Sequence, residues 1–350
     1  MSEQPFFVPD YYKNFHCKGG ACRHSCCGDW NIAISMAEYF RLLGMECTPE
    51  LRRRLDSALY QADDRDEEHY ANICPNYAGD CPMHREDGLC GLQWEGGEEV
   101  LPDVCRQFPR SVTVFGRPIC VCSSACEHAV ELLTADDAPV AVEEALLPSY
   151  LLCHGRAVEH TPEREATARA CIRIAEDRSM PLSRRIDRIA AYLHGESMDR
   201  AADSLSQDTV FLIQQALARH YAEHSRAAGA YCRVALDTLP CAADFVRGLD
   251  ALERRFPSLW IWMEKLLVNY MLQECFPYTG RDRELKDEGL ALCAVYAFCL
   301  FLLVGNPVPD REAFIDLAAS AFRLIGHTAF DHNALVIIHR NIPSLFDGAH

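Results

Sequence analysis

Cysteines are the residues of this sequence whose type and spacing could do chemistry. The stretch CKGGACRHSCCGDW, residues 17–30, holds four of them, and two are adjacent. Twelve of the nineteen cysteines in the chain fall between residues 17 and 126. No secretory signal opens the sequence, so we expect a cytoplasmic protein with reduced thiols rather than a disulfide framework. Thiolate is a soft ligand, and several thiolates together select zinc or an iron–sulfur cluster.

The residues alone leave the metal and its ligands open. No CxxC pair occurs, so the spacing is not that of a zinc finger or zinc ribbon. The number of cysteines satisfies the four ligands of an iron–sulfur cluster and would permit two centres. We favour the cluster, with zinc as the alternative because His16, His24 and His84 lie near these cysteines in sequence. The candidate ligands are Cys17, Cys22, Cys26, Cys27, Cys81, Cys90, Cys105, Cys120, Cys122 and Cys126, with Cys47 and Cys74 as weaker candidates.

The later cysteines lie in apolar, helix-like surroundings. A free cysteine in such a segment behaves as a small hydrophobic residue. We therefore expect these seven to be core residues: Cys153, Cys171, Cys232, Cys241, Cys275, Cys293 and Cys299.

Charge and hydropathy exclude some classes of partner. The net charge of −17 argues against binding to nucleic acid or to an anionic membrane, since both require a basic surface. The longest apolar run, residues 290–305, is shorter than the ~20 residues that span a bilayer. It predicts a buried core helix. Phosphate-binding loops, HExxH and nucleophile-elbow motifs are missing from the sequence, and no residue is identified as a catalytic base.

The cysteine-rich part of the chain is predicted to be irregular. Glycine, proline, asparagine and aspartate interrupt every periodic stretch up to about residue 135. Two short helices are expected near 36–43 and 49–61, and a hairpin-like pair of strands near 89–94 and 111–122. Such a segment has few apolar anchors, so metal bonds would supply much of its stability.

Helical periodicity dominates from about residue 138. The segment 161–177 begins with Thr161 as N-cap and Pro162 in the first turn, and 181–195 ends at Gly195. Further helices are predicted at 209–224, 242–256, 258–276, 284–304 and 310–326. We therefore expect a mainly α protein, with an irregular cysteine-rich metal-binding region over 1–135 packed on an α-helical domain over 136–350. The segment 134–144 is the expected linker.

Six blocks of the sequence, taken in order, resemble the flagellin lysine-N-methylase family. The blocks span nearly the whole chain and are NFHCKGGACRHSCCGDWNIAIS (14–35), CPMHREDGLCGLQ (81–93), VCRQFPR (104–110), SACEHAVELL (124–133), EKLLVNYMLQECFPY (264–278) and AFRLIGH (321–327).

This resemblance implies an enzyme and its cofactors. It implies methyl transfer from S-adenosylmethionine to surface lysines of flagellin, by a protein that holds an iron–sulfur cluster, expected to be 4Fe–4S. Cys120 and Cys122 lie outside the family pattern. The ligands that the resemblance carries over are Cys17, Cys22, Cys26, Cys27, Cys81, Cys90, Cys105 and Cys126.

A second functional hypothesis comes from the cysteines alone. The chain would then be a non-catalytic or electron-transfer protein that binds an iron–sulfur cluster or zinc, with the helical region as an interaction module. An assay of methyl transfer distinguishes the two hypotheses, because only the enzyme requires S-adenosylmethionine as methyl donor.

Overall fold

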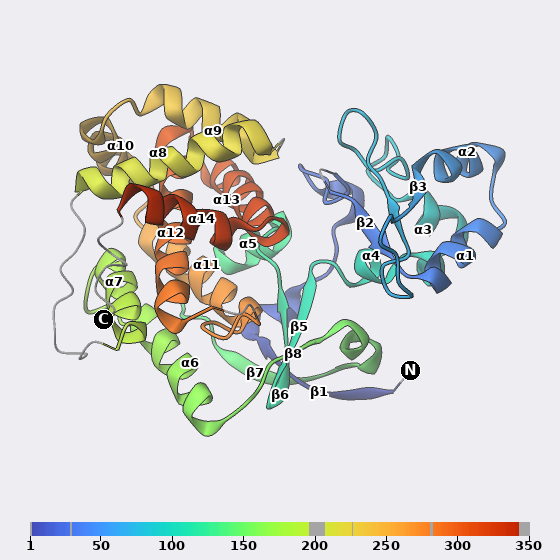
Figure 1. Cartoon of the computed structure of the whole chain (residues 1–350), viewed down its shortest axis with the longest axis horizontal. Helices are drawn as coiled ribbons and strands as arrows, with labels where there is room; N and C mark the ends of the chain where they lie inside the picture. The colour runs from blue at the N-terminus through green and yellow to red at the C-terminus, as the bar shows by residue number, and fades with distance from the viewer. Residues whose placement is uncertain (1, 29, 196–206, 226, 281–282, 343–350) are drawn as a thin grey trace. The chain divides into compact units, whose positions relative to one another are not determined.

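The computed structural model describes residues 2–28, 30–195, 207–225, 227–280 and 283–342, and the chain divides into two compact units. Unit 1 comprises Met1–Phe15 and Pro109–His350, and unit 2 comprises His16–Phe108. Figure 1 shows the helices and strands of each unit. This division differs from the expected boundary between residues 135 and 136, because the first strand of the chain and residues 109–135 belong to the helical unit.

Unit 2 is built on a small antiparallel sheet with short helices around it. The strands β2 (Ile32–Ile34), β4 (Ala71–Ile73) and β3 (Leu59–Gln61) lie in that order. Its core includes Leu42, Leu55 and Met83, which are at most 1% exposed. The helices are α1 (Met36–Gly44), α2 (Pro49–Ala58), α3 (Gly91–Gly96) and α4 (Asp103–Gln107), and the 3₁₀ turns are η2 (Gly19–Ala21) and η3 (Glu98–Val100).

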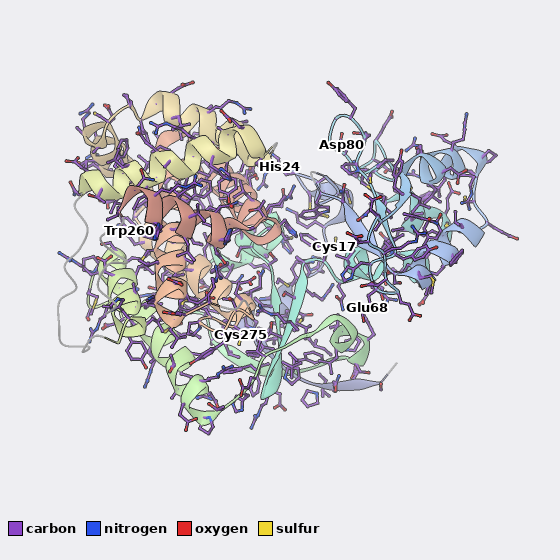
Figure 2. All side chains as sticks on the ribbon, in the orientation of Figure 1. Cys17, His24, Glu68, Asp80, Trp260 and Cys275 are labelled. Carbon is purple, nitrogen blue, oxygen red and sulfur yellow. The ribbon has the colours of Figure 1, made fainter. Side chains whose placement is uncertain are left out.

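The two helices expected in unit 2 are present, but one of the expected strands is wrong. The second helix, α2, ends at Ala58 because Leu59–Gln61 pairs with β4. Residues 89–94 do not form a strand, since Cys90 caps helix α3 and Gly91 begins it. The segment 63–69 is exposed, as expected for its acidic sequence, and includes Glu68 (Figure 2).

Unit 1 contains a five-stranded sheet that the sequence revealed only in part. Its strand order is β7 (Val142–Pro148), β1 (Glu3–Pro9), β6 (Arg117–Cys122), β5 (Arg110–Phe115) and β8 (Arg156–Ala157). The segment 111–122, expected as one strand, instead forms two paired strands, β5 and β6, which are joined at Gly116, whose φ of +68° suits glycine. The expected linker 134–144 lies inside unit 1, and its last residues belong to β7, which pairs with β1.

Helices form the rest of unit 1 and confirm the mainly α prediction. Thr161 caps the helix that begins at Pro162, as predicted, by accepting a hydrogen bond from the Arg164 N–H. The helices are α5 (Glu127–Leu133), α6 (Pro162–Ala175), α7 (Leu182–Leu193), α8 (Gln207–His224), α9 (Ala227–Thr238), α10 (Ala242–Arg255), α11 (Leu259–Glu274), α12 (Leu285–Gly305), α13 (Arg311–His327) and α14 (Phe330–Asn341), with 3₁₀ turns η1 (Asp10–Asn14) and η4 (Ser149–His154). Of these, α5, α9 and α14 were not predicted.

Helix α12 is the centre of the helical unit. It packs against α7, α8, α9, α10, α13 and α14. By length and composition it could cross a membrane, but 83% of its most apolar window is buried inside the protein. The prediction of a buried core helix at this position is confirmed.

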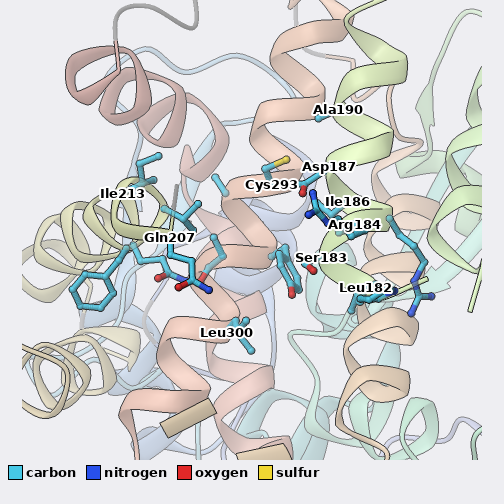
Figure 3. Close-up of a pocket in the computed structure, with 18 of the residues that line it drawn as sticks. Leu182, Ser183, Arg184, Ile186, Asp187, Ala190, Gln207, Ile213, Cys293 and Leu300 are labelled. Carbon is cyan, nitrogen blue, oxygen red and sulfur yellow. The ribbon is translucent and has the colours of Figure 1, made fainter. Parts of the chain in front are cut away.

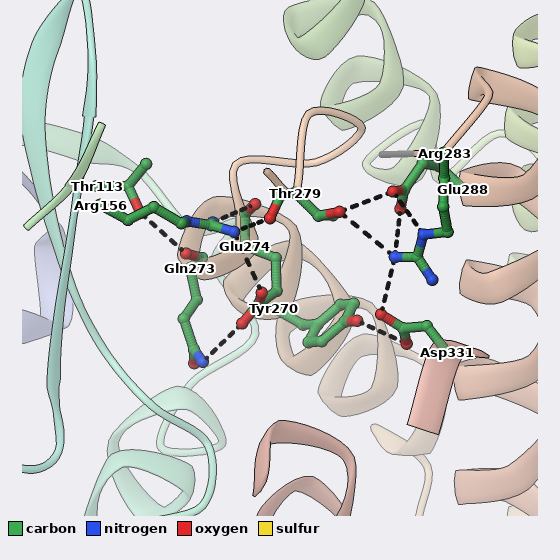
Figure 4. A network of polar contacts seen from close by, with 9 residues as sticks. All are labelled: Thr113, Arg156, Tyr270, Gln273, Glu274, Thr279, Arg283, Glu288 and Asp331. Carbon is green, nitrogen blue, oxygen red and sulfur yellow. Dashed lines mark hydrogen bonds and ion pairs between the residues drawn. The ribbon is translucent and has the colours of Figure 1, made fainter. Parts of the chain in front are cut away.

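Buried polar contacts join the elements of unit 1. Asn269 of α11 is fully buried, accepts a 2.6 Å hydrogen bond from the Tyr11 hydroxyl and donates to the carbonyl of Cys122. Figure 4 shows a second network, in which Arg283 binds Glu288 and Asp331, and Asp331 also accepts from Tyr270. These contacts fix α11 and α12 against their neighbours.

Candidate metal centre and cavity

Four thiols of unit 2, from segments that are far apart in sequence, lie near enough for their charges to act on one another's pKa values. Burial, together with the charges of Cys27 and Cys90, raises the pKa of Cys81 to about 12. Cys105 is exposed as a residue, yet desolvation of its sulfur and the charges of Cys27, Cys81 and Cys90 raise its pKa well above the usual range. Because these thiols act electrostatically on one another, we treat them as one group and call it the cysteine quartet: Cys27, Cys81, Cys90 and Cys105.

Backbone hydrogen bonds bring Cys27 and Cys81 together. The main-chain N–H of Cys81 donates to the carbonyl of Cys27 at 2.8 Å. Gly28 and Asp80 form an antiparallel bridge at the adjacent positions. The two cysteines therefore lie on neighbouring extended segments.

The chain then turns back so that Cys90 returns to Cys81. His84 and Cys90 form an antiparallel bridge, and the N–H of Gly91 donates to the carbonyl of Met83 at 2.7 Å. Burial raises the pKa of both thiols, while the nearby main-chain N–H groups of Met83 and His84 lower that of Cys81 in part and those of Gln93 and Leu92 lower that of Cys90 in part. Such N–H donors stabilise a thiolate and tune a metal bound to it.

The fourth thiol is placed by a buried carboxylate that sequence reasoning missed. Glu38 is 7% exposed and shares a capping box with Ser35 at the start of α1. Its second oxygen accepts a 2.6 Å hydrogen bond from the N–H of Asp103, the first residue of the short helix that carries Cys105. The pattern SxxE before an apolar run was the available signal for the cap.

Two glycines hold the segment 17–22 against the loop that leads to Cys90. A Cβ on Gly20 would meet the carbonyl oxygen of Asp87 at 2.2 Å, and one on Gly88 would meet the Gly20 Cα at 2.7 Å. Gly88 also has a φ of +78°, where side chains other than glycine are strained. Both positions therefore require glycine for the two segments to touch.

The predicted ligands outside the quartet lie in three different surroundings. Cys17 is exposed (Figure 2), and its sulfur accepts a 3.4 Å hydrogen bond from the Gly19 N–H. Cys22 and Cys26 are half-buried on the same segment. Cys126 belongs to unit 1. In that unit, burial is the main cause that raises the pKa of Tyr11, and the charges of Cys122, Cys120 and Cys126 raise it further.

The two cysteines that the family pattern omits form a buried pair in unit 1. Cys120 and Cys122 lie two residues apart on β6, so their side chains share one face, and both are fully buried. Burial raises their pKa values, to about 11 for Cys120, and the Arg110 guanidinium lowers both in part.

The later cysteines are core residues for the most part. Cys171, Cys232, Cys275 and Cys299 are buried and Cys293 is half-buried, as expected. Cys241 is exposed at the start of α10, so the prediction is wrong there. The side chain of Cys153 lies outside the described residues.

A large cavity lies within the helices of unit 1. Its volume is about 1250 Å³, and its walls come mainly from α7, α8, α10 and α12. Figure 3 shows Asp187 and Arg184 of α7 beside Cys293 of α12 at this cavity. No sequence motif pointed to it, because its lining residues are spread over six helices.

Comparison with known proteins gives three partial matches. The chain is 27% identical over 146 residues to proteins named lysine-N-methylase from Salmonella choleraesuis and Salmonella typhimurium, covering 41% of this chain and 36% of each relative. It is 28% identical over 112 residues to flagellar biosynthetic protein FliU of Salmonella muenchen, covering 32% of this chain and 65% of that protein. The matched segment thus spans about a third of the first two relatives. No family model and no solved structure match the chain. The resemblance to lysine-N-methylases predicted from the sequence blocks is confirmed.

Proposed function

We propose that this chain is a protein lysine N-methyltransferase that transfers methyl groups from S-adenosylmethionine to surface lysines of flagellin. The observation that carries the proposal is the likeness to two proteins named lysine-N-methylase. The likeness to a protein named as flagellar supports flagellin as the protein substrate.

We further propose that the cysteine quartet holds the iron–sulfur cluster implied by the resemblance. Four thiols in one place match the donor set of a 4Fe–4S cluster, and the N–H groups of Met83 and His84 are suited to a thiolate at Cys81. Zinc accepts the same four sulfurs and is the alternative metal. When bound, the metal supplies bonds that tie three segments of unit 2 together.

The chemistry of the proposed reaction sets two requirements on the protein. A lysine amine attacks a methyl group only when it is neutral, but its ordinary pKa is about 10.4. The protein must therefore desolvate the ammonium group or offer a carboxylate that accepts its proton. It must also hold the nitrogen about 3–3.5 Å from the methyl carbon.

We propose a cytoplasmic location. The described cysteines are free thiols, eighteen in number, which is the state expected in a reducing compartment.

The test is methyl transfer to purified flagellin. Full-length protein, purified without oxygen, is incubated with flagellin and S-adenosylmethionine that carries a deuterated methyl group. Mass spectrometry should find labelled methyl groups on flagellin lysines, and none on flagellin whose lysines have been acetylated. Metal-loaded protein that transfers no label contradicts the proposal and favours a non-catalytic or electron-transfer metal protein.

A further inference from the structure

The cavity of unit 1 is large enough for more than one small molecule. Its volume of about 1250 Å³ exceeds the roughly 300–1,000 Å³ that is usual for small-molecule sites. Much of the wall is apolar, with aromatic rings from Phe211, Phe245, Trp260 and Tyr296. Such walls suit a methylene stem or a planar base.

One carboxylate and one hydroxyl in the wall have no hydrogen-bond partner inside the described part of the chain. Asp187 is half-buried and makes no hydrogen bond there, and neither does the Tyr296 hydroxyl. The two groups lie close together, because the charge of Asp187 adds to the effect of burial in raising the pKa of Tyr296. Polar groups in such a place require a ligand or solvent to satisfy them.

The charges around Asp187 leave its carboxylate available to a cation. Burial raises the pKa of Asp187, and the exposed Arg184 on the same helix lowers it in part. Arg185 also lines the cavity and its charge lowers the pKa of Tyr296 in part, but its guanidinium is bound to Glu264 and to the carbonyl of Ala175. Across the cavity, Trp260 donates a 3.0 Å hydrogen bond to Glu253, while Cys293 and Tyr296 face from α12.

We propose that this cavity receives the lysine side chain that is to be methylated, with Asp187 as the acceptor of its proton. The inference rests on the proposed function and deepens it. The apolar wall contacts the four methylene groups, and the Asp187 carboxylate meets the ammonium group at the end of the stem. The remaining volume admits the sulfonium donor.

The proposed step transfers one proton and one methyl group. The ammonium group of the substrate gives one proton to the Asp187 carboxylate and becomes a neutral amine. The nitrogen lone pair forms a bond to the methyl carbon, while the carbon–sulfur bond breaks and its electron pair stays on sulfur as a thioether. The product is a methylammonium group, and Asp187 releases its proton to solvent.

A labelling experiment tests the location without any methyl transfer. Wild-type protein is treated with a water-soluble carbodiimide and glycine amide, and the labelled carboxyl groups are mapped by mass spectrometry. Flagellin at about ten times its Kd should reduce labelling of Asp187 by about tenfold, because only about a tenth of the protein then remains unbound. Flagellin with acetylated lysines should not. Asp237, exposed on α9, is the internal control and should react equally in all samples.

A variant tests the role as proton acceptor. Asp187→Asn should lower kcat/KM by about 10²–10⁴, the usual range for loss of a general base. Asp237→Asn should stay within twofold of wild type. Flagellin in which a methylated lysine has been replaced by cysteine and then converted to aminoethylcysteine, whose ammonium group is more acidic than that of lysine, should recover part of the lost rate in Asp187→Asn. A merely structural role predicts no such recovery.

The outcomes separate this inference from the proposed function. Wild-type protein that methylates flagellin, while Asp187 stays unprotected or Asp187→Asn keeps its activity, overturns the inference alone. Wild-type protein that methylates nothing overturns both. If Asp187→Asn does not fold, the labelling of wild-type protein decides the location.

Discussion

Cys81 donates its main-chain N–H to the carbonyl oxygen of Cys27 at 2.8 Å, and this contact joins two distant parts of the cysteine-rich sequence. The same loop returns to place Cys90 beside them, and α4 adds Cys105. Four thiols in one fold unit form a donor set that a soft metal binds.

Replacement of a quartet cysteine should remove the metal. Cys81→Ser should lower the bound metal per chain by more than about tenfold, because a serine hydroxyl is a poor ligand for a soft metal. Cys74→Ser is the matched control, since Cys74 is in the same unit and burial alone raises its pKa. The measurement is metal analysis of the two purified variants. Equal metal in both would exclude Cys81 as a ligand.

Metal uptake should depend on pH in a defined direction. Because the pKa values of Cys81, Cys90 and Cys105 are raised, these thiols are protonated in the metal-free protein at neutral pH. Binding must expel their protons, so affinity rises with pH. A zinc titration of reduced, metal-free protein at pH 7 should release about three or more protons per zinc, read with an indicator dye. Release of fewer than two would show that the thiols are already ionised or do not bind.

One methyl group added at the contact between Gly88 and Gly20 should lower both the stability of the protein and its metal content. Gly88→Ala adds a Cβ at 2.7 Å from the Gly20 Cα and strains a φ of +78°, so it should cost about 2–3 kcal/mol and lower the metal content. Gly195→Ala has a similar φ but nothing within 4 Å, and should cost only about 1–2 kcal/mol with metal unchanged. Denaturant unfolding and metal analysis of both variants make the comparison. Identical behaviour would mean that the close approach to Gly20 is unimportant.

Loss of a buried ion pair in unit 1 should lower the free energy of unfolding more than loss of a surface ion pair. Glu264 is 1% exposed and binds Arg185 at 2.6 Å and Arg178 at 2.8 Å. Glu264→Gln leaves the buried Arg185 without a counter-charge and should cost about 3–5 kcal/mol. Glu165→Gln breaks an exposed pair with Arg169 and should cost at most about 1 kcal/mol. Urea unfolding of both variants is the measurement, and similar midpoints would contradict the prediction.

The sequence predicted the helices of unit 1 well where caps and apolar stripes agree. Helices α6 and α7 begin and end within a few residues of their predicted bounds, because Thr161, Pro162 and Gly195 carry local signals. Helix α9 lacks such signals and was missed. The apparent strand at 89–94 is the first turn of a helix, since alternation over six residues does not distinguish the two.

The number of cysteines predicted that a metal site exists, but it did not predict which cysteines form that site. Cysteine counts indicated a metal centre, yet which thiols meet depends on hydrogen bonds such as Cys81 to Cys27 and on the buried carboxylate Glu38. Cysteine spacing alone does not fix such pairings. The cavity of unit 1 was not predictable, because Asp187 and Tyr296 become neighbours only when α7 packs on α12.

The most direct test of the metal centre is the iron and sulfide content of the full chain purified without oxygen, together with its visible spectrum. The account predicts a brown protein with about four iron and about four sulfide per chain, as in a 4Fe–4S cluster. A colourless protein that holds zinc or no metal would contradict the cluster.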